Sequence, residues 1–66
     1  MDHDQVLDNA AVAELFGISP SAMRGMRFRG EGPPHFKLGR KPLYRRSVVL
    51  EWIIQQEKAE RERKAA

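Results

Sequence analysis

The chain has 66 residues, a mass of 7.6 kDa, no cysteine and a net charge of +3, with 32% charged residues. This length gives room for one small domain with too little interior for a catalytic pocket, so we expect no enzyme. The lack of cysteine excludes disulfides and suits a cytoplasmic, reducing compartment. The chain has no apolar run of about 20 residues, so we expect no membrane span. Its start is acidic and lacks an apolar segment, so we expect no secretory signal.

The charge is divided unevenly along the chain. Residues 1–18 sum to −4 and residues 47–66 sum to zero, whereas residues 19–46 hold eight basic residues and one acidic residue, which leaves +7. Basic residues gathered in one segment are typical of a protein that binds a polyanion. The alternative is a solvated basic surface that serves only solubility.

A first short helix is predicted to follow Asp8. Asp8 is its N-cap, because a carboxylate at this position accepts hydrogen bonds from the unpaired N–H groups of the first turn. Val12, Leu15 and Phe16 recur at spacings of three and four and are expected to form the buried face. Gly17 then ends the helix in a left-handed conformation.

A second helix is predicted from Pro20 to about Arg29. Ser19 is its N-cap, and proline is favoured at the first helical position. Only two residues separate the two helices, which predicts a helix-turn-helix. Met23 and Met26 lie on one side of this helix and are expected to enter the core.

The opposite side of the second helix is expected to face the polyanion. In a helix-turn-helix protein this helix enters the DNA major groove, where Arg24 can bond bidentately to guanine. Glycine at position 25 is unfavourable in mid-helix, so Gly25 makes room either for DNA or for a closely packed helix. Three roles are open for Phe28: contact with a thymine methyl group, contact with another protein, or burial beneath the next element. We favour the last two. The predicted DNA-binding residues of this helix and its cap are Ser19, Ser21, Ala22, Arg24, Gly25, Arg27, Phe28 and Arg29.

A β-hairpin with a basic tip is predicted next. Its two short strands, residues 35–38 and 43–45, flank a turn that contains glycine and proline. Phe36, Leu38 and Tyr44 are expected to face the helices. Such a wing can place its tip in a minor groove and its flanks on phosphates. The predicted DNA-binding residues of the wing and its flanks are Lys37, Arg40, Lys41, Arg45 and Arg46.

A final helix is predicted with Ser47 as its N-cap. Val49 and Trp52 lie on its inward face, and we expect Trp52 to close the core rather than to stack on bases. No apolar stripe follows Gln56, so residues 1–56 are predicted to form the domain and residues 57–66 a charged helical extension.

The predicted fold is therefore mainly α with a short β-hairpin wing, a winged helix-turn-helix. His3 and His35 have no suitably spaced partners, and the glycines next to prolines cannot form a phosphate loop. We expect no catalytic residue, no metal site and no cofactor.

Five stretches of the chain carry a family resemblance: Val12–Arg24, Arg27–Pro34, Lys37–Lys41, Tyr44–Val48 and Trp52. Together they resemble the MerR-like winged helix-turn-helix domain of the excisionase (Xis) family, over nearly the whole chain. Among members of this family, the chain resembles the small phage excisionases, with mycobacteriophage as a suggested source.

The resemblance implies a recombination directionality factor in the host bacterial cytoplasm. Such a factor binds double-stranded attachment-site DNA, bends it and steers a tyrosine integrase toward excision. It implies DNA contacts by Ser21, Arg24 and the wing, although family members are often basic where this chain has Gly25 and Phe28.

Two alternatives remain open for the function: a small transcriptional repressor of the same fold, and a protein-interaction module that does not bind DNA. The segment after Gln56 lacks the apolar positions of a coiled coil. We therefore expect a monomer in solution that binds beside neighbouring copies on DNA.

Overall fold

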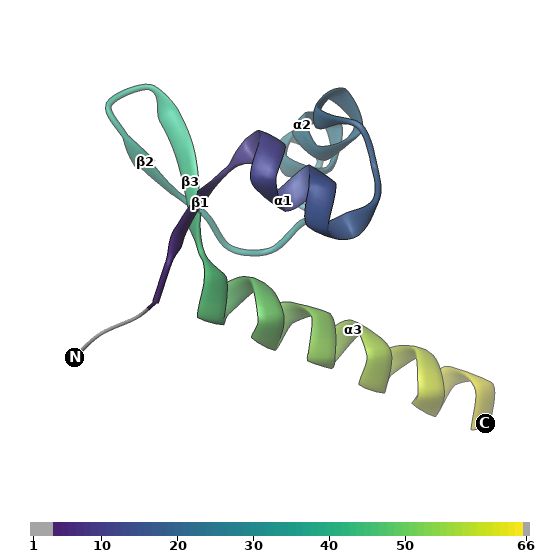
Figure 1. The fold of residues 1–66 in the computed structure, drawn as a ribbon. Helices are drawn as coiled ribbons and strands as arrows, with labels where there is room; N and C mark the ends of the chain where they lie inside the picture. The colour runs from purple at the N-terminus through teal and green to yellow at the C-terminus, as the bar shows by residue number, and fades with distance from the viewer. Residues whose placement is uncertain (1–3, 66) are drawn as a thin grey trace.

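Three helices and one three-stranded sheet form within residues 4–65, the part of the chain that the computed structural model describes (Figure 1). The elements are β1 (Val6–Asp8), α1 (Asn9–Phe16), α2 (Pro20–Phe28), β2 (Phe36–Leu38), β3 (Lys41–Arg45) and α3 (Arg46–Ala65). The predicted mainly helical fold with a β-hairpin wing is confirmed, and β1 is an additional strand that the sequence analysis did not predict.

The two short helices begin and end as their capping residues predict. The Asp8 carboxylate accepts a hydrogen bond of 2.8 Å from the N–H of Ala11, and the Ser19 hydroxyl accepts one of 3.0 Å from the N–H of Ala22. Gly17 ends α1 with a φ of 73°, in the left-handed region that glycine adopts without strain. These local interactions set the tight turn between α1 and α2.

β3 is the central strand of an antiparallel sheet with the order β1-β3-β2. Leu38 pairs with Lys41, so the hairpin loop is only Gly39 and Arg40, two residues shorter than predicted. Pro42, which was predicted to lie in the turn, therefore lies in the central strand β3. Proline is tolerated there because the pairing of β3 with β1 covers only residues 43–45 and does not require a donor at Pro42.

The core takes residues from each helix and from the central strand. Phe16 packs against it from α1, as predicted. Three residues that were predicted to face the interior are exposed instead, Leu15 at 48%, Phe36 at 40% and Leu38 at 71%. Leu15 lies away from the face of α1 that carries its buried residues, and the hairpin extends past the helices (Figure 1). The buried hydrophobic residues are Val12, Ala13, Met23, Tyr44 and Val49.

The N-terminus of α3 is capped from the other end of the described chain. The predicted N-cap role of Ser47 is wrong, since Ser47 is the second residue of α3. Asp4 supplies the cap: one carboxylate oxygen accepts from the Ser47 N–H at 2.8 Å and the other accepts from the Ser47 hydroxyl at 2.7 Å. The Arg46 N–H donates to the Gln5 carbonyl at 2.8 Å, so the segment before β1 joins α3 to the sheet.

We expect the stability of the protein to fall on acidification because of this cap. The hydrogen bonds from the Ser47 N–H and hydroxyl, with a smaller contribution from the Arg45 charge, lower the pKa of Asp4, and desolvation only partly opposes them. A carboxyl whose pKa is lower in the folded state adds stability above its unfolded pKa, near 3.8, and loses it as the pH falls through the folded value. Urea unfolding between pH 7 and pH 2 should show this loss.

The matched variants are Asp4→Asn and Glu51→Gln, each of which removes one carboxylate. Asp4→Asn should be less stable than the native protein at pH 7 and should lose less stability on acidification, whereas Glu51→Gln, which changes an exposed residue of α3, should follow the native curve. Equal acid sensitivity of Asp4→Asn and the native chain would contradict the role of the cap.

Candidate nucleic-acid interface

The outward face of α2 carries the predicted recognition residues. Ser21, Ala22 and Arg24 are exposed, whereas Met23 on the opposite side is completely buried. Within residues 4–65, no carboxylate forms an ion pair with Arg24. Its guanidinium is thus available to an external acceptor, at the second turn of a helix whose N-terminus also favours anions.

Arg27 lies elsewhere. It is half-buried, and its Nη1 donates to Asn9 Oδ1 at 3.0 Å, while Asn9 Nδ2 donates to the Pro20 carbonyl at 3.0 Å. These hydrogen bonds join the first and the last turn of α2 to the start of α1, so Arg27 holds the two helices together. The sequence analysis missed Asn9, since nothing local links it to an arginine 18 residues away.

Arg29 is also engaged, in an exposed ion pair with Glu31 at 2.7 Å. Its side chain folds back along α2: the three nearest atoms to a Cβ placed on Gly25 all belong to Arg29, the closest at 3.1 Å. No neighbouring helix is among them, so close helix packing does not explain the glycine. The absence of a side chain at Gly25 instead leaves the space that the Arg29 guanidinium occupies.

Phe28 is 83% exposed, so of the two alternatives favoured from the sequence, burial beneath the hairpin is wrong and a protein contact stays untested. α1 packs against both α2 and β3 and so separates the end of α2 from the hairpin (Figure 1). The last residue of α2 is left without an apolar neighbour to cover it.

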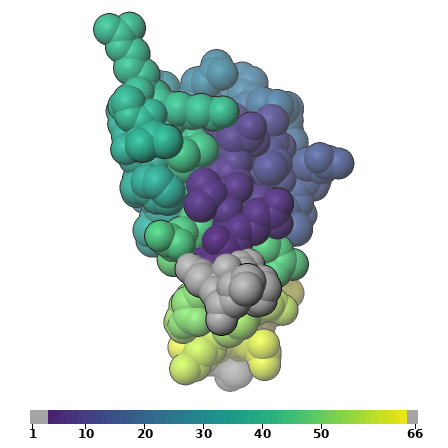
Figure 2. Space-filling view, turned by 60° about the vertical axis from the view of Figure 1, so that its left-hand side comes forward, coloured from purple at the N-terminus to yellow at the C-terminus, as the bar shows by residue number. Residues whose placement is uncertain are grey.

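The wing presents further basic side chains at the end of the molecule where α2 lies. Figure 1 shows the hairpin loop and α2 on the side away from α3, and in Figure 2 side chains of the hairpin (teal to green) project beside α2 (blue). Arg45 pairs with Asp4 at 3.5 Å. Four other basic side chains are exposed and have no carboxylate partner in the described chain: Lys37, Arg40 and Lys41 in the hairpin, and Arg46 at the start of α3, at the far end of β3 from the tip.

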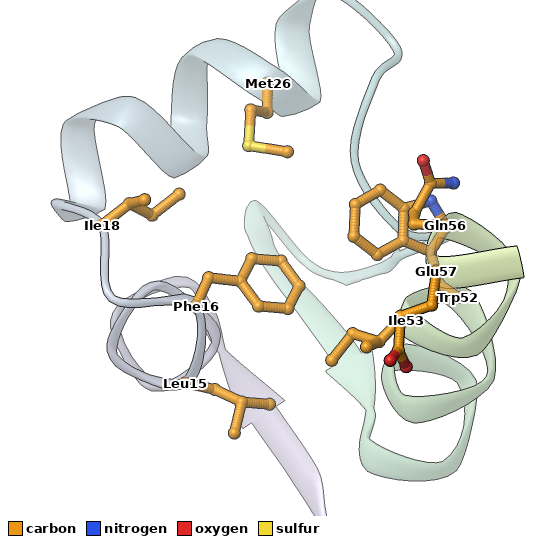
Figure 3. A pocket seen from close by; sticks show the side chains of 8 residues that line it. All are labelled: Leu15, Phe16, Ile18, Met26, Trp52, Ile53, Gln56 and Glu57. Carbon is orange, nitrogen blue, oxygen red and sulfur yellow. The ribbon is translucent and has the colours of Figure 1, made fainter. Parts of the chain in front are cut away.

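An open apolar groove separates α1 and α2 from α3 (Figure 3). The rings of Phe16 and Trp52 stack across it with centroids 5.5 Å apart. Trp52 is therefore half-buried in the groove wall, and the prediction that it closes the core is wrong. The groove contains no basic residue and is not part of the cationic surface. Its lining residues are Leu15, Phe16, Ile18, Met26, Trp52, Ile53, Gln56 and Glu57.

Within residues 4–65 the structure contains no cluster of three or more potential metal ligands among His, Cys, Asp and Glu. Over the same residues, none of the helices has the length and apolarity needed to cross a membrane.

The tight α1–α2 turn, the exposed α2 and the basic β2–β3 hairpin define a winged helix-turn-helix protein. Residues 6–57 match the family described as the helix-turn-helix domain, and the chain belongs to this family, which contains excisionase-like small DNA-binding proteins. No curated protein and no solved structure gives a significant match. The family and the fold indicate sequence-specific DNA binding, with α2 in the position of the recognition helix.

Replacing both Arg40 and Lys41 with glutamine should weaken DNA binding almost equally on all sequences. Each phosphate contact that is lost should lower the slope of log K against log salt by about 0.9, because fewer counterions are released. Titrations at several salt concentrations measure this slope. The matched control is Lys58→Gln with Arg61→Gln, which removes the same two charges from α3; if both double variants lose the same slope, the wing makes no specific phosphate contacts.

Proposed function

We propose that the protein is an excisionase with a MerR-like winged helix-turn-helix, a recombination directionality factor of a phage. The observation that carries the proposal is a cationic surface on α2 and the wing, in a chain whose family contains excisionase-like proteins. Its members without a carboxylate partner within residues 4–65 are Arg24, Lys37, Arg40 and Lys41. The resemblance of nearly the whole chain to that group supplies the specific role.

In this role the protein has no catalytic residues or cofactor of its own. It binds attachment-site DNA in the bacterial cytoplasm, and Arg24 and the wing set its position on the duplex. Bending then places the DNA arms for a tyrosine integrase, which carries out strand exchange. Bent DNA costs elastic energy, so several contacts along the helix are needed to maintain the bend.

Neighbouring copies supply those additional contacts. One recognition helix and one wing cover only a short sequence, and one module discriminates weakly against the many competing sites of a genome. We expect a monomer in sedimentation experiments and cooperative binding to DNA with two or three repeated sites. A stable dimer without DNA, or equal independent affinities at each repeat, would contradict this expectation.

The decisive experiment is a recombination assay with the integrase of the source genome and its attachment sites. Excision should require the protein, integration should not, and Arg24→Ala should need a higher protein concentration for the same stimulation. A footprint over a promoter without any effect on excision would indicate the repressor instead. Absence of salt-dependent DNA binding would indicate a protein-interaction module.

A further inference from the structure

Phe28, on the recognition helix, is the most exposed large apolar side chain in the described part of the chain. Its exposed fraction is 83%, against 71% for Leu38 and 56% for Ile54. An uncovered aromatic ring at the end of a helix surrounded by basic residues has no role in the fold, because burial is what stabilises such a side chain.

The position of Phe28 places its ring on the outward face of α2. Residues three and four apart share a helix face, so Phe28 follows Gly25 and Arg24 by one turn on that face. Helical side chains lean toward the N-terminus, over the turn that holds Arg24 and Gly25. The Arg29 guanidinium lies over Gly25, yet the Phe28 ring stays 83% exposed. The next residue, Arg29, is paired with Glu31, whereas Arg24 is not paired within residues 4–65.

Only one apolar group is present on the base edges of the major groove, the 5-methyl group of thymine. We propose that Phe28 reads this methyl group, so that the protein requires a thymine at one position of its site. This inference rests on the proposed DNA binding and names the base contact that α2 makes beyond Arg24.

The spacing along the helix predicts where that thymine lies. Four residues of helix rise about 6 Å, and one base-pair step along the duplex is about 3.4 Å. A helix aligned with the groove therefore puts the thymine roughly two base pairs from the guanine that Arg24 contacts.

The test replaces each thymine of the bound site, one at a time, with uracil, which lacks only the methyl group. At one position uracil should weaken binding by the native protein about fourfold, the value of one buried methyl group. The same replacement should leave binding by Phe28→Ala unchanged. Phe28→Leu, which keeps an apolar contact, should retain part of the sensitivity.

Leu38→Ala is the matched control, because it removes the other strongly exposed apolar side chain, on the wing. It should keep the full response to uracil. Circular dichroism should show native helix content for all three variants, as neither residue is buried.

The outcomes separate this inference from the proposed function. Specific binding in which no uracil position depends on Phe28 overturns the inference and leaves the DNA-binding role intact. If Phe28→Ala instead loses only the cooperativity between repeated sites, Phe28 contacts a neighbouring protein and the inference is wrong. If the chain binds no DNA specifically, both proposals fail together.

Discussion

Met23→Ala should destabilise the protein more than any change on its surface, by about 2–5 kcal/mol. Met23 is completely buried in the core cluster that also contains Val12, Tyr44 and Val49, so its truncation leaves a cavity in the core. A domain of 66 residues has a free energy of unfolding of roughly 3–10 kcal/mol, so the variant should be partly or wholly unfolded at 37 °C. Urea unfolding followed by circular dichroism measures the difference.

Two methionine variants serve as controls. Met23→Leu conserves the volume and should cost less than about 1.5 kcal/mol. Met26→Ala changes the half-buried methionine that lines the open groove, where solvent can replace the lost atoms, and should cost less than Met23→Ala. Equal losses at the two alanine variants would show that the core is not centred on Met23.

Arg24→Ala should lower affinity for the specific site by about 1–3 kcal/mol, roughly 5- to 150-fold, and should relax discrimination at one base pair. The reason is that Arg24 is exposed on the outward face of α2 and has no competing carboxylate within residues 4–65. Titrations on the site and on its single-base variants measure both effects.

Arg24→Lys separates base recognition from charge. Lysine keeps the positive charge but lacks the planar fork of arginine, so this variant should keep nonspecific affinity and lose most of the base preference. If Arg24→Lys discriminates between bases as well as the native protein does, Arg24 contacts phosphate rather than a base edge.

The structure divides the predicted interface residues into exposed side chains and side chains engaged within the fold. Arg24, Lys37, Arg40 and Lys41 are exposed, as a DNA-contacting role requires, whereas Arg27 is tied to Asn9 in a contact between helices. Charge and helical periodicity show which residues are basic and which side of a helix they occupy. They do not show which basic side chains are held in contacts within the fold.

Local features of the sequence determined the helix-turn-helix. Asp8, Ser19 and Gly17 act on backbone groups within a few residues of themselves, so their effect does not depend on the rest of the fold. The glycine turn likewise indicated the hairpin, and the helical spacing placed Met23 in the core. The boundary between residues 1–56 and 57–66 stays a prediction, and α3 continues through it as one helix.

Only the tertiary structure decided the features that depend on distant contacts. Asp4 caps α3 across 43 residues of sequence, and β1 exists because β3 offers it a partner. A three-residue strand and a single acidic side chain have no local signature, since their stability comes from groups that the folded chain brings to them. The exposure of Phe28 has the same origin, because α1, and not α2, lies against the central strand.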